Sequence, residues 1–260
     1  MGDKELDVNA IVLALITFLC TFSAALTATV VRGRLPAPHL SKESQDVVRL
    51  GVGLVATMTA LLLGLVTAAA RSTFDAQDVA IRNSGAAILT LDRHLARYGP
   101  ETQRTRDLIR RAVAARIDEI WHNGGSGTQA LHAAGTTAPV EDVENQILAL
   151  SPQTDNQRWF KSESLKLSQE IVKARWRVLE SSGGAVPVPF LVVVIFWLTV
   201  TFASFGLYAP RNATVVAVLF VASVSVAAAV FLVLELDGPL DGIIKISSQP
   251  MEYVLSQLGH

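Results

Sequence analysis

The sequence lacks the residues from which redox, metal and nucleic-acid sites are usually built. Its single cysteine, Cys20, lies inside an apolar run, so neither an intrachain disulfide nor a cysteine-rich zinc site can form. The histidines are scattered without the spacing of metal ligands: His39, His94, His122, His132 and His260. With 22 Lys and Arg against 23 Asp and Glu, the net charge is -1. We therefore expect no transition-metal site and no nucleic-acid partner.

The sequence also lacks recognisable catalytic motifs. It has no Gly-x-Ser-x-Gly, no His-Glu-x-x-His and no phosphate-binding loop. The triplet Asp92-Arg93-His94 lies on a predicted helix whose next turns carry core residues, so its likeness to catalytic triplets is accidental. We predict that the chain is not an enzyme and carries no organic cofactor.

Long apolar runs are what the sequence does contain. Half of its residues are hydrophobic, and the mean hydropathy is +0.39. Charge-free runs of about 20 residues are long enough to cross a hydrocarbon core as helices. They predict transmembrane helices at 8–31, 50–70, 187–208 and 213–234. Because the leader before residue 8 is mixed in sign and the first run is long, we expect a retained span, not a cleaved signal.

The polar stretches between the runs complete the predicted organisation. Helical periodicity over residues 71–186 predicts a helical soluble domain between the second and third spans. Residues 235–260 form an amphipathic tail, expected to lie on that domain or on the membrane surface. The connector 32–49 holds Pro36 and Pro38 and is predicted to be a loop. The predicted fold class is an all-α integral membrane protein with four transmembrane helices and a large helical soluble insertion.

The second span carries a stripe of small and weakly polar residues on one helical face. No proline or cap separates this span from the helix after it, so one helix is expected to continue to Tyr98. The stripe has two interpretations, close helix packing or the lining of a polar pathway. Its members, at alternating steps of four and three, are Gly53, Thr57, Ala60, Gly64, Thr67 and Arg71.

Positive charge is concentrated on the second helix of the soluble domain. In a ring-shaped oligomer these side chains would line a vestibule and attract anions. The other interpretation is a solvated face paired with neighbouring acids such as Asp107 and Glu119. The vestibule candidates are Arg104, Arg106, Arg110 and Arg111.

Four segments together resemble the bacterial bestrophin-like membrane proteins. They are Leu91-Asp92-Arg93 with Leu95 to Glu101, then Phe196-Trp197, then Phe202 to Asn212, and finally Glu235 to Gly242. The resemblance spans nearly the whole chain.

This resemblance implies a pentameric anion channel whose pore is lined by the second span. The small stripe facing the axis would make a wet pore, and the neighbouring apolar face would make a dewetting gate. That alternative face carries Met58, Leu61 and Leu65. The second span lacks the aromatic-rich neck of bestrophins.

Bestrophins also carry a dense acidic calcium clasp after the fourth span. Here the stretch directly after that span holds only Glu235, Asp237 and Asp241. They suggest either a Ca²⁺ site completed by backbone carbonyls or a helix-terminal turn anchored to arginine.

The expected location is the bacterial inner membrane, with the termini and the soluble domain in the cytoplasm. That side has seven basic residues near the spans, against five on the other. They are Lys4, Arg71, Arg82, Lys173, Arg175, Arg177 and Lys245, against Arg32, Arg34, Lys42, Arg49 and Arg211. The expected partners are membrane lipid, further copies of the chain and inorganic anions. The alternative function is a non-conducting scaffold that binds a partner membrane protein through its helical domain.

Overall fold

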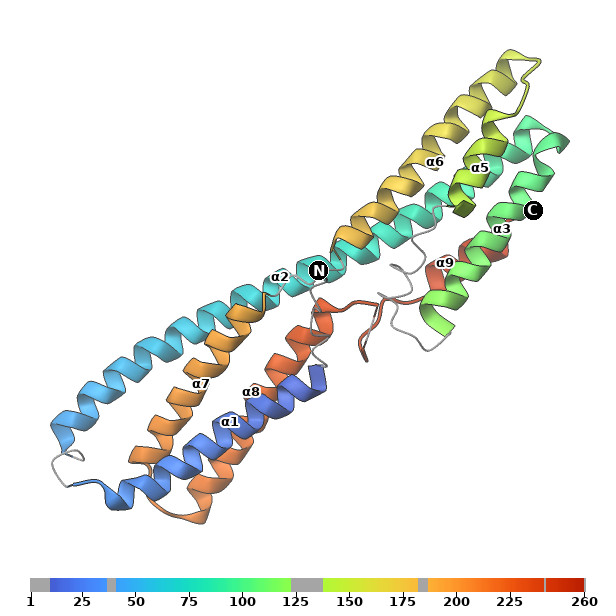
Figure 1. The fold of residues 1–260 in the computed structure, drawn as a ribbon. Coiled ribbons are helices and arrows are strands. Elements are labelled where there is room, and N and C mark those ends of the chain that lie inside the picture. Colours follow the sequence, from blue (N-terminus) through green and yellow to red (C-terminus); the bar gives the residue numbers. More distant parts are fainter. Residues whose placement is uncertain (1–9, 37–40, 123–137, 182–186, 241, 260) are drawn as a thin grey trace, which may run out of the picture. The chain divides into compact units, whose positions relative to one another are not determined.

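The computed structural model describes residues 10–36, 41–122, 138–181, 187–240 and 242–259. These residues are mainly helical and contain no strand. The chain divides into two compact units, a membrane unit (residues 1–72 and 185–237) and a soluble unit (residues 73–184 and 238–260). Helix α2, Lys42–Tyr98, contributes residues to both units (Figure 1).

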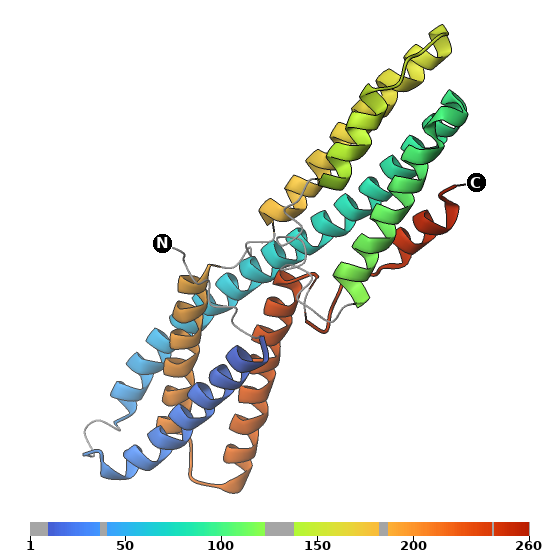
Figure 2. The ribbon, with the colours of Figure 1, turned by 45° about the vertical axis from the view of Figure 1, so that its right-hand side comes forward.

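The membrane unit contains α1 (Ala10–Val31), the first part of α2, α7 (Val188–Tyr208) and α8 (Ala213–Asp237). Within the described residues these four helices are long and apolar enough to cross a membrane. The all-α fold with four spans and a soluble helical insertion is therefore confirmed. Helix α1 lies beside both α7 and α8, as both ribbon views show (Figures 1 and 2).

Small side chains bring α1 close to its neighbours. Thr17, Thr21 and Ala25, spaced by four residues, are fully buried, and the threonine hydroxyls donate to carbonyls of their own helix. On α7, Gly206 lies so close to α1 that an added Cβ would stand 2.0 Å from the carbonyl oxygen of Ala25. Close approach of this kind is how helices associate in lipid, where burial of apolar surface drives little.

Hydrogen bonds from side chains to backbone carbonyls join the end of α1 to the α7–α8 turn. The Arg211 guanidinium donates to the carbonyls of Thr29 (2.8 Å) and Val30 (3.0 Å). Arg32 donates in turn to the carbonyl of Ala209. Asn212 caps α8 by accepting from the Val215 amide at 2.8 Å. These bonds satisfy carbonyls and amides that helix ends leave open.

Helix α2 begins within residues 32–49, which the sequence predicted to be a loop. It begins at Lys42, because the Ser41 hydroxyl accepts from the Ser44 amide (3.2 Å) and acts as a helix cap. The backbone hydrogen bond at this helix start, together with the Ser41 side chain, lowers the pKa of Glu43. The cap residue Ser41 therefore sets where the helix begins.

The soluble unit folds around the second part of α2. Gly99 (φ 146°) ends that helix and Pro100 opens the turn Pro100–Thr102. Then come α3 (Gln103–Ile117), a π-helical turn (Asp118–His122), α5 (Ala138–Leu148) and α6 (Asp155–Ser181). The main core lies between these helices and the C-terminal α9 (Gln249–Gln257). Its buried members include Leu91, Leu95, Ile109, Val113, Ile147 and Val254.

The C-terminal tail packs into the soluble unit. Met251, Val254 and Leu258 are buried in the core, and the indole of Trp121 donates to the carbonyl of Ile246 at 2.8 Å. The tail was expected to lie either on the soluble domain or on the membrane surface. In the structure it lies on the soluble domain.

Candidate functional site

The membrane part of α2 packs through one face only. Thr59 and Ala70 are buried on that face. Leu63 and Val66 border a small void shared with α7 and α8, where the facing residues are Phe190, Leu191, Val194, Val230 and Val233. At about 100° per residue, positions 59, 63, 66 and 70 fall on one side of the helix. This side joins α2 to its own chain.

The predicted pore stripe lies away from that packing face. Gly53, Thr57, Ala60, Gly64, Thr67 and Arg71 are all exposed in the single chain. A Cβ added at Gly53 or Gly64 would meet nothing within 4 Å. The hydroxyls of Thr57 and Thr67 donate to their own helix, to the carbonyls of Gly53 (2.9 Å) and Leu63 (2.6 Å). Packing within the chain therefore does not explain these small residues.

The alternative gate residues are exposed as well. Met58, Leu61 and Leu65 lie on the other flank of the open side, and Leu61 has 75% of its surface exposed. Only 6% of the most apolar 18-residue stretch of α2 is buried, against 17%, 28% and 22% for the first, third and fourth spans. Of the four spans, α2 offers the largest share of its surface to something outside the chain.

The four vestibule candidates separate into two groups. Arg104, Arg110 and Arg111 are exposed on α3. The side chain of Arg106 is only 11% exposed and forms a two-point ion pair with Asp92 of α2, which is fully buried. The bonds are 2.8 Å from Nε to Oδ1 and 3.0 Å from Nη2 to Oδ2. The hydrogen bond to Asp92 raises the pKa of the Arg106 guanidinium.

This ion pair argues against a vestibule role for Arg106, and that role stays a prediction. A guanidinium neutralised by a buried carboxylate offers little field to a passing ion. Sequence reasoning missed this pair, because the two residues are 14 positions apart and meet only once the chain has turned at Gly99. The available signal was an acid at position 92 between the apolar positions Leu91 and Leu95.

The structure describes two of the three acidic residues that were suggested to hold Ca²⁺. Glu235 is buried at the end of α8 and Asp237 is half-buried, whereas Asp241 lies outside the described residues. Among the residues that the structure does describe, no three His, Cys, Asp or Glu side chains group closely enough to hold a metal ion.

Comparison with known proteins gives a family and a fold. No curated protein matches the sequence. Three crystal structures of single-residue variants of a bacterial bestrophin homologue from Klebsiella pneumoniae share the fold, with TM-scores of 0.65, 0.67 and 0.66. Their sequence identities are 14%, 14% and 13%, and each alignment covers 94% of this chain and 97% of the other.

The family assignment rests on the sequence itself. The family model for the Bestrophin-like domain matches residues 19–251, which includes all four segments that carried the resemblance. The chain is a membrane protein and belongs to the bestrophin-like family.

Proposed function

We propose that the protein is an oligomeric ion channel whose pore is lined by the membrane part of α2. The supporting observation is the low burial of that part, 6% of its most apolar stretch, in a helix where a Cβ added at Gly53 or Gly64 would meet nothing within 4 Å. A membrane helix that leaves small and polar side chains open is suited to contact other copies and water, and poorly suited to face lipid alone.

The exposed side of α2 has two flanks. In a ring of copies, one flank would face the central axis and the other would contact the neighbouring copy. Small residues such as Thr57 and Gly64 would line the axis, where exposed backbone and hydroxyl oxygens meet water. Large residues such as Leu61 and Leu65 would face the neighbouring copy. In the reverse arrangement the large residues would form a dewetting gate. Membership of the bestrophin-like family favours a ring of identical copies, with five as the family pattern.

The charged face of α3 is the proposed source of selectivity. Arg104, Arg110 and Arg111 are exposed and cluster within two helical turns. Like charges gathered in a vestibule attract anions and repel cations. We place the soluble unit in the cytoplasm and the spans in the bacterial inner membrane, following the count of basic residues near the spans.

The experiment is planar-bilayer recording of the purified full-length protein, with its mass measured in detergent. We expect discrete currents from a ring of about five copies. Replacing Arg104, Arg110 and Arg111 together by Gln should lower the chloride-to-sodium permeability ratio, while the matched control Arg158→Gln, an exposed charge on α6, should not. Electrically silent bilayers together with a monomeric mass would contradict the proposal.

A scaffold that binds a membrane partner is the second candidate. It is favoured by exposed tryptophans on α6, Trp159 at 54% and Trp176 at 58%. Large exposed aromatic side chains are common in protein interfaces. A monomer that co-purifies with one membrane protein in fixed ratio and conducts no current would support this candidate over the channel.

A further inference from the structure

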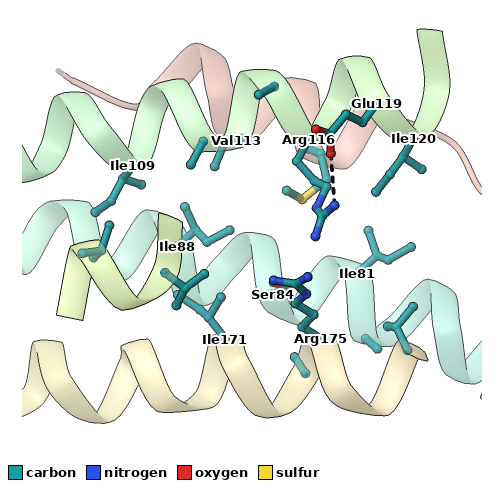
Figure 3. Close-up of a pocket in the computed structure, with 18 of the residues that line it drawn as sticks. Ile81, Ser84, Ile88, Ile109, Val113, Arg116, Glu119, Ile120, Ile171 and Arg175 are labelled. Atoms are coloured by element: carbon teal, nitrogen blue, oxygen red, sulfur yellow. Dashed lines mark hydrogen bonds and ion pairs between the residues drawn. The ribbon is translucent and has the colours of Figure 1, made fainter. Parts of the chain in front are cut away.

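The soluble unit contains a cavity of about 270 Å³ between α2, α3, α5 and α6. Its walls are mainly apolar, with Ile88 from α2, Val113 from α3, Val143 from α5 and Ile171 from α6 (Figure 3). Protein interiors are packed almost without voids larger than a water molecule. A cavity of this size lies near the lower limit of small-molecule sites, so it is large enough to hold a ligand.

The cavity is elongated along its helices. Lining residues on α2 run from Ala80 to Leu91, eleven steps that correspond to about 16 Å of helix. On α6 they run from Ser168 to Val178. An elongated apolar space accepts a flexible hydrocarbon chain more readily than a compact or highly polar molecule.

Two arginines reach into the cavity from opposite walls. Figure 3 shows Arg116 of α3 and Arg175 of α6 pointing toward one another. Glu119 accepts from Arg116 at 3.1 Å, so the charged lining comprises two guanidiniums and one carboxylate. Burial lowers the pKa of Arg175, and the nearby positive charge of Arg116 lowers it further. An anion placed between the two guanidiniums would reduce the repulsion between their positive charges.

A buried hydroxyl marks another part of the wall. Ser168 is only 1% exposed, and its Oγ has no hydrogen-bond partner within the described part of the chain. It lines the cavity two turns of α6 away from Arg175. Buried polar groups without a partner are rare, and an explanation is often an unseen ligand or water beside them. The wall is therefore unlike that of a sealed, purely apolar void.

We propose that this cavity binds a single-chain amphiphile with a carboxylate head, a medium-chain fatty acid. The carboxylate lies between Arg116 and Arg175, and the acyl chain lies along the apolar walls formed by Ile88 and Ile171. This site is separate from the proposed pore, and its occupancy is independent of whether the protein conducts ions.

Photolabelling of the full-length protein in zwitterionic nanodiscs tests this site. The probe is decanoate carrying a diazirine, and the labelled peptides are identified by mass spectrometry. We expect labels on residues 80–91, 109–121 and 168–178, displaced by free decanoate at concentrations at least tenfold lower than by decanol. The carboxylate and its charge-assisted hydrogen bonds provide this difference.

Four variants test the binding of the head group and the filling of the apolar space separately. Arg175→Gln should weaken displacement by decanoate about tenfold or more, Arg175→Lys should restore part of it, and Arg158→Gln on the same helix should change nothing. Ala112→Phe fills the cavity and should remove the labels there, while thermal unfolding stays cooperative. Labels confined to the spans would overturn the proposal. Equal displacement by decanol, or labelling unchanged in Arg175→Gln, would also overturn it.

Discussion

At the scale of single residues, the Asp92–Arg106 pair has the largest expected effect on the soluble unit. The carboxylate is fully buried and meets the guanidinium at two points, with a weaker contact from the Gly259 amide at 3.4 Å. Such a pair ties α2, α3 and the C-terminal end of the chain together. Its two charges are costly to bury and therefore depend on one another.

Removing one partner should destabilise the unit strongly. Asp92→Asn removes the buried negative charge that faces Arg106 and should lower the free energy of unfolding by about 3–5 kcal/mol. Urea unfolding of the full-length protein, followed by tryptophan fluorescence, measures the change, because Trp121, Trp159 and Trp176 all lie in the soluble unit.

Two further variants complete that measurement. Asp92→Leu combined with Arg106→Met removes both charges and should cost less than the sum of the two single changes. Arg158→Gln, whose partner Asp155 is 94% exposed, should have little effect. A simple sum for the double variant would show that the two residues are not coupled.

The residues of the soluble core were easier to predict than this pair. Leu91 and Leu95 are four residues apart on α2, as Ile109 and Val113 are on α3, and all four are buried. Helical period depends on neighbours along one helix, whereas an ion pair depends on the angle at which two helices meet. The turn at Gly99 sets that angle, and no local pattern reports it.

At the scale of helices, the small residues of α1 and α2 have opposite environments. Thr17, Thr21 and Ala25 of α1 are fully buried, but the small stripe of α2 is exposed. Both helices show the same kind of spacing in the sequence. Small residues at this spacing therefore identify a helix that another helix can approach closely. Only the structure shows whether that second helix belongs to the same chain.

The α1–α7 contact is tested by adding a single methyl group. Gly206→Ala would place a Cβ 2.0 Å from the Ala25 carbonyl oxygen, so α1 must move. We expect a loss of about 1–3 kcal/mol in stability from this overpacking. The measurement is unfolding of the purified protein by sodium dodecyl sulfate, followed by circular dichroism.

The matched control is Gly51→Ala, at a glycine of α2 where an added Cβ meets nothing within 4 Å. It should be neutral or slightly stabilising, since alanine favours the helix. Equal effects of the two changes would show that Gly206 does not set the spacing between α1 and α7.

At the scale of the whole molecule, the orientation in the membrane can be tested with introduced cysteines. In a Cys20→Ala background, Glu43→Cys at the start of α2 should react with an impermeant maleimide in intact cells. Ser162→Cys, exposed on α6 of the soluble unit, should react only after the cells are opened. The basic residues near the spans predict this result. The reverse labelling pattern would place the soluble unit outside the cytoplasm.

The number of copies was not predictable from the residues alone. Four spans follow from the length of apolar runs, because the bilayer fixes how many residues a helix needs. A ring depends on how exposed faces such as those of Thr57 and Leu61 meet in a second copy. The single chain defines those faces but not their partner.

The most direct test of the channel account is modification of α2 cysteines during current recording. In the Cys20→Ala background, a charged thiol reagent should block current through Thr57→Cys and Gly64→Cys. It should leave Thr59→Cys unchanged, because Thr59 is only 4% exposed on the packing face. Block at Met58→Cys and Leu65→Cys instead would turn the other flank toward the axis. Currents insensitive to modification at all of these positions would contradict a pore lined by α2.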